Sequence, residues 1–219
     1  MTQLVPNRFL FDFEFPLRRF VTPPALDGKL TGWTDAYRLP DLGELDNART
    51  FAPVWAGWHE SGLFVACRVE GRRQPLRCDP LAYWQGDNLR LCIDTRDARN
   101  IRRASRFCRQ VYILPTGAGP RGDRPTAGAG KFTQAREHAP PVSPSDFTVA
   151  ARVTRTGYTL EVHVHARALP GWDPVEHPRI GFHYMLEDTD HGQQYLTVGD
   201  DLYWFTDPSS WATAVLVRE

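Results

Sequence analysis

The sequence is poor in lysine and has no excess charge of either sign. Lys29 and Lys131 are its two lysines, and 26 basic residues (Lys and Arg) are balanced by 26 acidic ones over 219 residues. A chain without a net electrostatic field does not attract nucleic acid or an anionic membrane over long distances. We therefore expect neither as a partner, while the sequence leaves the oligomeric state open.

Long apolar runs are also missing. No stretch approaches the ~20 consecutive apolar residues that a transmembrane helix requires. Asp12, Glu14 and Pro16 interrupt every apolar run near the start, so residues 1–20 lack the apolar core of a signal peptide. We expect a cytoplasmic protein, or an extracellular or periplasmic one if the start has been trimmed.

Recognisable cysteine and catalytic motifs are absent. Cys67, Cys78, Cys92 and Cys108 include no CxxC pair and no nearby histidine in metal-finger spacing. Cys67 and Cys92 lie in apolar patterns, where a free cysteine usually acts as a small buried hydrophobic residue, and a Cys78–Cys108 bridge stays open. Because the sequence also has no nucleophile elbow, phosphate loop or HExxH motif, we expect no catalytic centre.

What the sequence does contain is strand-like alternation. In Asp87–Thr95, Leu89, Leu91 and Ile93 alternate with polar or small neighbours. Many such segments with turn residues at short intervals, and no alternation of strands with helices, predict an all-β fold. We expect a single-domain antiparallel β-sandwich of immunoglobulin-like or jelly-roll-like type. The other expected strands are two hairpins (50–70 and 147–167) and the segments 107–114, 180–186 and 212–217.

The expected domain has an N-terminal extension and one loose segment. Residues 1–24 are expected to form the extension with the first strand, and residues 25–219 the sandwich. Residues 115–130 are rich in glycine and proline and have almost nothing to bury. We therefore expect this segment to be a flexible surface loop.

Six segments between Ala25 and Val217 stand out by their motifs and their order. The segments are LDGKLTGW (26–33), VWAGWHESGLFVACRV (54–69), WQGDNLRLCID (84–94), GYTLE (157–161), RIGF followed by ED (179–182 and 187–188) and DPSSW (207–211). Together they resemble the family 9 carbohydrate-binding modules and the related DOMON-like sandwiches. The resemblance implies a β-sandwich that holds its ligand between aromatic side chains at one end.

The resemblance also implies candidate binding residues. Sugar rings present apolar C–H faces and a rim of hydroxyls, so a sugar site combines flat aromatic rings with a few polar groups. Trp84 and Trp204 stand where the family places its two aromatic rings, with Phe205 as the alternative to Trp204. The polar positions differ, since Arg90 replaces a glutamate and Tyr112 and Met185 replace polar residues. The expected ligand-binding residues are Trp84, Asp87, Arg90, Tyr112, Trp204 and Phe205.

Metal ions are not expected. The loop that binds calcium in some family members corresponds to Gly71–Arg77, which contains no carboxylate. His163 and His165 share one face of a strand, a spacing that binds zinc where a third ligand such as His183 converges, but we expect an ordinary solvated face. The sequence thus predicts no cofactor.

Several functions remain compatible with these observations. The first is a non-catalytic domain that binds a saccharide. The second is a structural or protein-interaction sandwich that has lost the sugar site, because the polar positions differ. The arginine-rich segment Asp94–Arg109 offers a third, binding of an anionic ligand, since guanidinium groups bind carboxylate or phosphate with two hydrogen bonds. An enzyme acting on a sugar derivative would need a pair of carboxylates that sequence spacing cannot identify.

Overall fold

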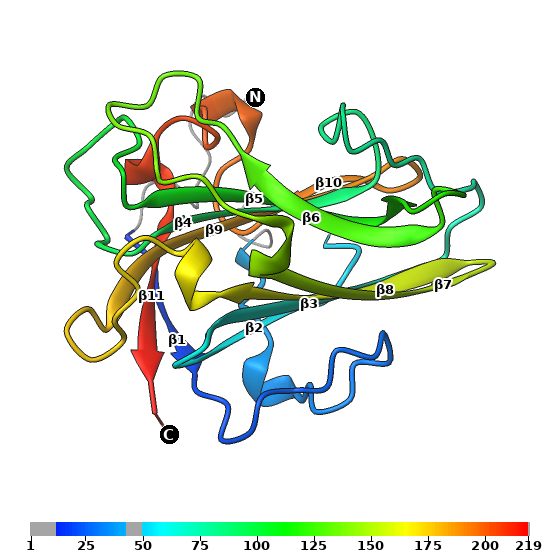
Figure 1. Cartoon of the computed structure of the whole chain (residues 1–219), viewed down its shortest axis with the longest axis horizontal. Helices are drawn as coiled ribbons and strands as arrows, with labels where there is room; N and C mark the ends of the chain where they lie inside the picture. The colour runs from blue at the N-terminus through cyan, green and yellow to red at the C-terminus, as the bar shows by residue number, and fades with distance from the viewer. Residues whose placement is uncertain (1–11, 43–49, 219) are drawn as a thin grey trace, which may run out of the picture.

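The fold is a sandwich of two β-sheets. The computed structural model describes residues 12–42 and 50–218. Figure 1 shows the two sheets as layers, with β4, β5, β6 and β9 in one and β2, β3, β7 and β8 in the other. Apart from the parallel pair β1 and β11, neighbouring strands are antiparallel. The predicted all-β antiparallel sandwich is therefore confirmed.

The strand orders follow from the hydrogen-bonded pairs. The large sheet has the order β1-β11-β9-β4-β5-β6, with β10 paired to β9, and the small sheet has the order β2-β3-β8-β7. The large sheet consists of β1 (Glu14–Arg18), β4 (Asn88–Asp94), β5 (Cys108–Ala118), β6 (Arg124–Gly130), β9 (Arg179–Asp188), β10 (Gly192–Tyr195) and β11 (Ala212–Val217). The small sheet consists of β2 (Val54–His59), β3 (Gly62–Glu70), β7 (Phe147–Thr154) and β8 (Gly157–His165).

Helical structure in the described residues is limited to single 3-10 turns. None of these helical segments is long and apolar enough to cross a membrane. The turns are η2 (Asp35–Tyr37), η4 (Pro144–Asp146), η5 (Ala166–Ala168), η6 (Asp200–Leu202) and η7 (Pro208–Ser210).

The main core fills the space between the sheets. Leu89, Leu91 and Ile93 of β4 all point into it and are fully buried, as their alternation predicts. Burying one such side chain contributes about 1.5–3 kcal/mol of hydrophobic free energy. The hairpin of β2 and β3 turns at Gly62, whose φ of +138° suits glycine and whose missing Cβ makes room for the backbone of β8.

A second hydrophobic cluster covers part of the outer face of the large sheet. Cys92, Cys108 and Met185 project from that face and are packed beneath Trp204 and Trp211. The large sheet is therefore buried on both faces at this end. All four cysteines are free, so the Cys78–Cys108 bridge does not form.

The expectation of a flexible loop at residues 115–130 is wrong. Residues 115–118 continue β5, residues 124–130 form β6, and the turn between them is short (Figure 1). Strand pairing here depends on backbone hydrogen bonds rather than on side-chain burial, which is why a segment of glycine and alanine can form an edge strand. Gly128 also has a specific role, because a Cβ at this position would lie 2.5 Å from the hydroxyl oxygen of Tyr112.

The first strand is part of the sandwich. β1 pairs with β11 in parallel, and Phe15 and Leu17 point into the main core. Within the predicted N-terminal segment, residues 12–24 thus contribute to the fold, while residues 1–11 lie outside the described part of the chain. The division at residue 24 stays a prediction.

Candidate functional site

Three neighbouring strands bring polar and aromatic side chains together on the outer face of the large sheet. Arg90 of β4 lies directly opposite Tyr112 of β5 on one side and Met185 of β9 on the other. Because side chains alternate along a strand, Arg90 points away from the core that Leu89 and Leu91 fill. The candidate site is therefore on this outer face, beside the second hydrophobic cluster.

Arg90 is held in place by several contacts. Its Nη2 donates to Glu187 Oε2 at 3.2 Å, and its Nε donates to Asn88 Oδ1 at 3.1 Å. The guanidinium carbon lies 5.1 Å from the centroid of the Trp204 ring, within cation–π distance. Arg90 and Glu187 are both partly exposed, so this ion pair can also hydrogen-bond to a ligand.

An aromatic wall stands beside this ion pair. Tyr83 stacks on Tyr112 with ring centroids 4.2 Å apart, and Trp84 meets Tyr83 edge-to-face at 5.2 Å. Trp84 is 51% exposed, which is unusual for so large an apolar ring. Trp84 and Tyr112 were predicted from the sequence, whereas Tyr83 was missed although it directly precedes Trp84.

Trp204 lies differently from the prediction. Its exposed fraction is 0%, its Nε1 donates to Asp200 Oδ1 at 2.7 Å, and its ring packs against His183 at 5.3 Å. The chain turns at Tyr203, whose φ is +52°, and this turn directs Trp204 onto the sheet. The indole therefore presents no exposed face to pair with Trp84.

The neighbours of Trp204 have more exposed surface. Phe205 is half-buried and meets the Trp204 ring edge-to-face at 5.8 Å, and Tyr203 is 64% exposed. The aromatic rings available to a ligand from this segment are therefore Tyr203 and part of Phe205.

Asp87 is a structural residue and does not contact the open surface. It is fully buried, and it accepts hydrogen bonds from Arg72 Nη1 at 2.8 Å, the Arg77 backbone N–H at 2.6 Å and the Thr189 backbone N–H at 2.7 Å. With its oxygens engaged in this way, Asp87 cannot bind a ligand. The prediction that it belongs to the binding site is therefore wrong.

The cluster of Arg72, Asp87 and Asp188 also shows whether these residues fit a calcium ion. Arg72 also pairs with the fully buried Asp188, so one guanidinium lies between two carboxylates. The chain thus supplies its own cation where a calcium ion would need these oxygens, and the residues do not fit the ion. Within residues 12–42 and 50–218 no cluster of three or more His, Cys, Asp or Glu side chains could hold a metal ion.

The two histidines of β8 pack rather than converge on a site. His163 stacks on Phe64 with ring centroids 4.0 Å apart, and His165 lies 4.0 Å from His163. Nε2 of His163 donates to the Ser61 carbonyl at 3.0 Å. Burial and the neighbouring His165 lower the pKa of His163 to about 4, so this ring is neutral at pH 7. His183 belongs to the other sheet and does not join them.

Arg96, Arg99 and Arg109 of the arginine-rich segment do not converge on one anion site. Arg96 lies over the Phe107 ring at 4.4 Å and donates to the Gly171 carbonyl at 2.8 Å. Arg99 donates to the Trp211 carbonyl and pairs with Asp12 at 2.8 Å. Arg109 points instead toward the space between the sheets. These three side chains therefore have separate partners.

Solved structures with the same β-sandwich fold as this chain are known. A family 9 carbohydrate-binding module from Caldicellulosiruptor kristjanssonii in complex with cellotriose has a TM-score of 0.62 at 14% identity, covering 94% of this chain and 95% of that one. A family 9 module from the same organism in complex with glucose has a TM-score of 0.61, also at 14% identity, covering 94% and 97%.

At this identity the likeness establishes the fold. The chain has the β-sandwich fold of the family 9 modules over nearly its whole length, as the six ordered segments predicted. Comparisons with protein-family models and with curated proteins gave no match.

Proposed function

We propose that this chain is a non-catalytic domain that binds a saccharide on the outer face of the large sheet. The observation that carries the proposal is the exposed Trp84 ring, supported by Tyr83 and Tyr112, beside the partly exposed Arg90–Glu187 pair. Two modules of the same fold are described in complex with cellotriose and with glucose, which favours this class of ligand.

The arrangement suits a neutral sugar. The apolar C–H face of a pyranose can lie on the Trp84 indole, while a pair of hydroxyls donates to Glu187 and accepts from Arg90. Because the charges of Arg90 and Glu187 compensate each other, a neutral ligand adds no unbalanced charge to the site. We therefore propose glucose-type saccharides rather than acidic ones.

Calorimetric titration with cellotriose and glucose tests this proposal. Replacing Trp84 by alanine should weaken saccharide binding at least tenfold, about 1.4 kcal/mol, because the stacking surface is lost. Leu81→Ala is the matched control, since Leu81 is 89% exposed in the same loop and contributes no aromatic ring. Saccharide affinities that are equal in the Trp84→Ala variant and in wild type would contradict the proposal.

The second candidate function is a sandwich that has lost its sugar site and serves as a structural or interaction domain. The complete burial of Trp204 favours it, because a single exposed indole cannot enclose a sugar ring from both sides. The same titrations distinguish the two candidates. Absence of binding to either saccharide at about 10 mM, a concentration at which even Kd values near 1 mM are detected, would support this second function.

A further inference from the structure

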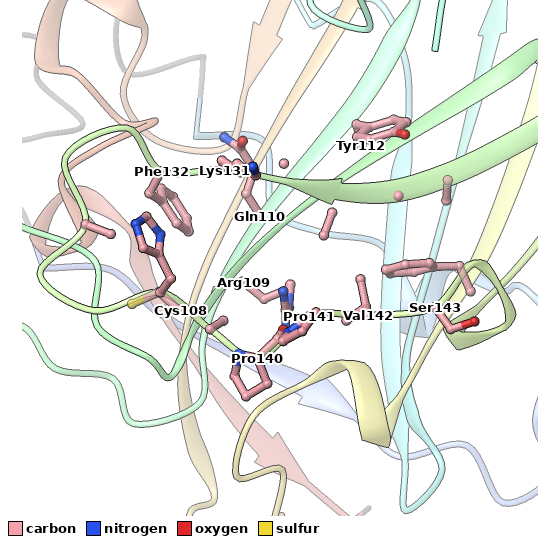
Figure 2. A pocket seen from close by; sticks show the side chains of 18 of the residues that line it. Cys108, Arg109, Gln110, Tyr112, Lys131, Phe132, Pro140, Pro141, Val142 and Ser143 are labelled. Atoms are coloured by element: carbon pink, nitrogen blue, oxygen red, sulfur yellow. The ribbon is translucent and has the colours of Figure 1, made fainter. Parts of the chain in front are cut away.

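A cavity opens at the edge of the sandwich. It has a volume of about 500 Å³ and lies between edge strand β6, the segment 137–144 and the start of β7. Arg109 lines it, and Figure 2 shows this side chain between Phe132 at one end and Ser143 at the other. Tyr112 also lines the cavity, whereas Trp84, Arg90 and Glu187 of the proposed sugar surface do not.

Arg109 is a buried cation whose hydrogen bonds are incomplete. It is 5% exposed, its Nε donates to the Ala168 carbonyl at 2.9 Å, and its Nη2 donates to the Pro140 carbonyl at 2.6 Å. Within the described residues Nη1 donates no hydrogen bond, and Arg109 forms no ion pair. Burial lowers the pKa of Arg109, and Asp146 opposes this change from a distance.

Asp146 does not neutralise this charge. Its carboxylate pairs with Arg167 through a direct hydrogen bond and accepts the Ser143 backbone N–H at 2.7 Å. Asp146 is therefore the direct counter-ion of Arg167 and not of Arg109. A buried charge that lacks a partner is costly, and an anion placed beside it would reduce this cost.

The other walls of the cavity are mainly apolar. Phe132 and Phe147 are buried, Val142 is half-buried, and Ala127 and Ala129 of β6 add only methyl groups. The small residues of β6 thus leave open a space that larger side chains would fill. Lys131 and Glu137 are exposed at the wall and have opposite charges, so Arg109 decides the sign of ligand that the interior favours.

We infer that this cavity binds a small organic carboxylate, with its carboxylate on Nη1 of Arg109 and its apolar body against Val142 and Phe147. The volume lies within the range of roughly 300–1,000 Å³ that is typical of small-molecule sites. A charge-assisted hydrogen bond to a buried guanidinium gives the carboxylate its selectivity.

Benzoate is the probe, and benzamide is its neutral counterpart of the same shape. We expect a two-dimensional NMR titration to give benzoate a Kd on the order of 1 mM, at least tenfold below that of benzamide. Arg109→Gln should remove the preference for the anion. Val142→Phe, which keeps Arg109 and fills the cavity, should weaken binding of benzoate at least about tenfold while leaving any saccharide binding unchanged.

The sugar surface provides the specificity control. Trp84→Ala should bind benzoate as wild type does, since Trp84 does not line this cavity. Equal affinities for benzoate and benzamide, no chemical-shift change at about 20 mM benzoate, or loss of benzoate binding in Trp84→Ala would each overturn the inference. None of these results depends on whether the domain binds a saccharide.

Discussion

Arg72 is the cation that pairs with two buried carboxylates, those of Asp87 and Asp188. Burial alone would lower its pKa, but hydrogen bonds and charge interactions with Asp87 and Asp188 outweigh this effect and raise it. Arg72→Met should lower the free energy of unfolding by about 3–5 kcal/mol, because two carboxylates would remain buried without a cation. Urea denaturation followed by tryptophan fluorescence measures this loss.

The neighbouring residue supplies the control for that substitution. The Arg73 side chain is exposed, so Arg73→Met should change the unfolding free energy by less than about 0.5 kcal/mol. Equal effects of the two substitutions would show that the buried ionic cluster does not stabilise the fold as described.

His163 makes stability depend on pH. Its pKa is about 4 in the folded protein and 6.5 in the reference state, so the unfolded chain binds more protons between these values. Stability should therefore fall as the pH decreases from about 6.5 to about 4, by on the order of 2 kcal/mol from this residue. Urea unfolding of wild type and His163→Gln at pH 7 and pH 4.5 measures it, and an unchanged difference in the variant would be evidence against this residue as the cause.

At the scale of single elements, β6 positions Tyr112 because Gly128 has no side chain. The Tyr112 ring occupies the space above Gly128, and Tyr83 stacks on Tyr112. Gly128→Ala should displace Tyr112 and weaken saccharide binding by about tenfold, with a stability loss of about 1–3 kcal/mol from overpacking. Calorimetric titration and thermal unfolding of this variant should be compared with those of Thr126→Ala, on the same face of the strand but paired with Leu114 rather than with Tyr112.

The strands that bury alternating apolar residues were predictable from sequence, and β6 was not. β4 carries Leu89, Leu91 and Ile93, and its periodicity predicts which face points into the main core. β6 has no such pattern, because its pairing comes from the backbone of β5, and backbone hydrogen bonding leaves little trace in the sequence. Glycine and proline therefore predicted a loop where an edge strand forms.

The residues of the candidate site also divide into those that were predictable from the sequence and those that were not. Trp84, Arg90 and Tyr112 lie on regular strands or beside one, so their positions followed from ordered motifs and alternation. Trp204 and Asp87 depend on how irregular segments fold back, and their burial is set by partners distant in sequence, such as His183 and Arg72. Sequence patterns describe local spacing, and these tertiary contacts are not local.

At the scale of the whole molecule, the reactivity of the free cysteines can be used to follow the unfolding of both hydrophobic clusters. Cys67 lies in the main core, and Cys92 and Cys108 lie in the second cluster. Burial raises the pKa of Cys67 and of Cys108 to about 12, so neither thiol is reactive at neutral pH. If the sandwich unfolds as one unit, a Cys78→Ser variant should react with a thiol reagent at all three positions at the same urea concentration. Labelling of Cys92 and Cys108 well before Cys67 would instead show that the second cluster opens separately.

The parallel pairing of β1 with β11 has a mechanical consequence. Glu14 lies beside Thr213 and Arg18 beside Val217, so a tension applied between the start of β1 and the end of β11 pulls the two strands past each other. Their hydrogen bonds are then stretched together rather than opened one after another. The strand pair can act as a mechanical clamp that resists extension of the chain until all of these bonds yield at once.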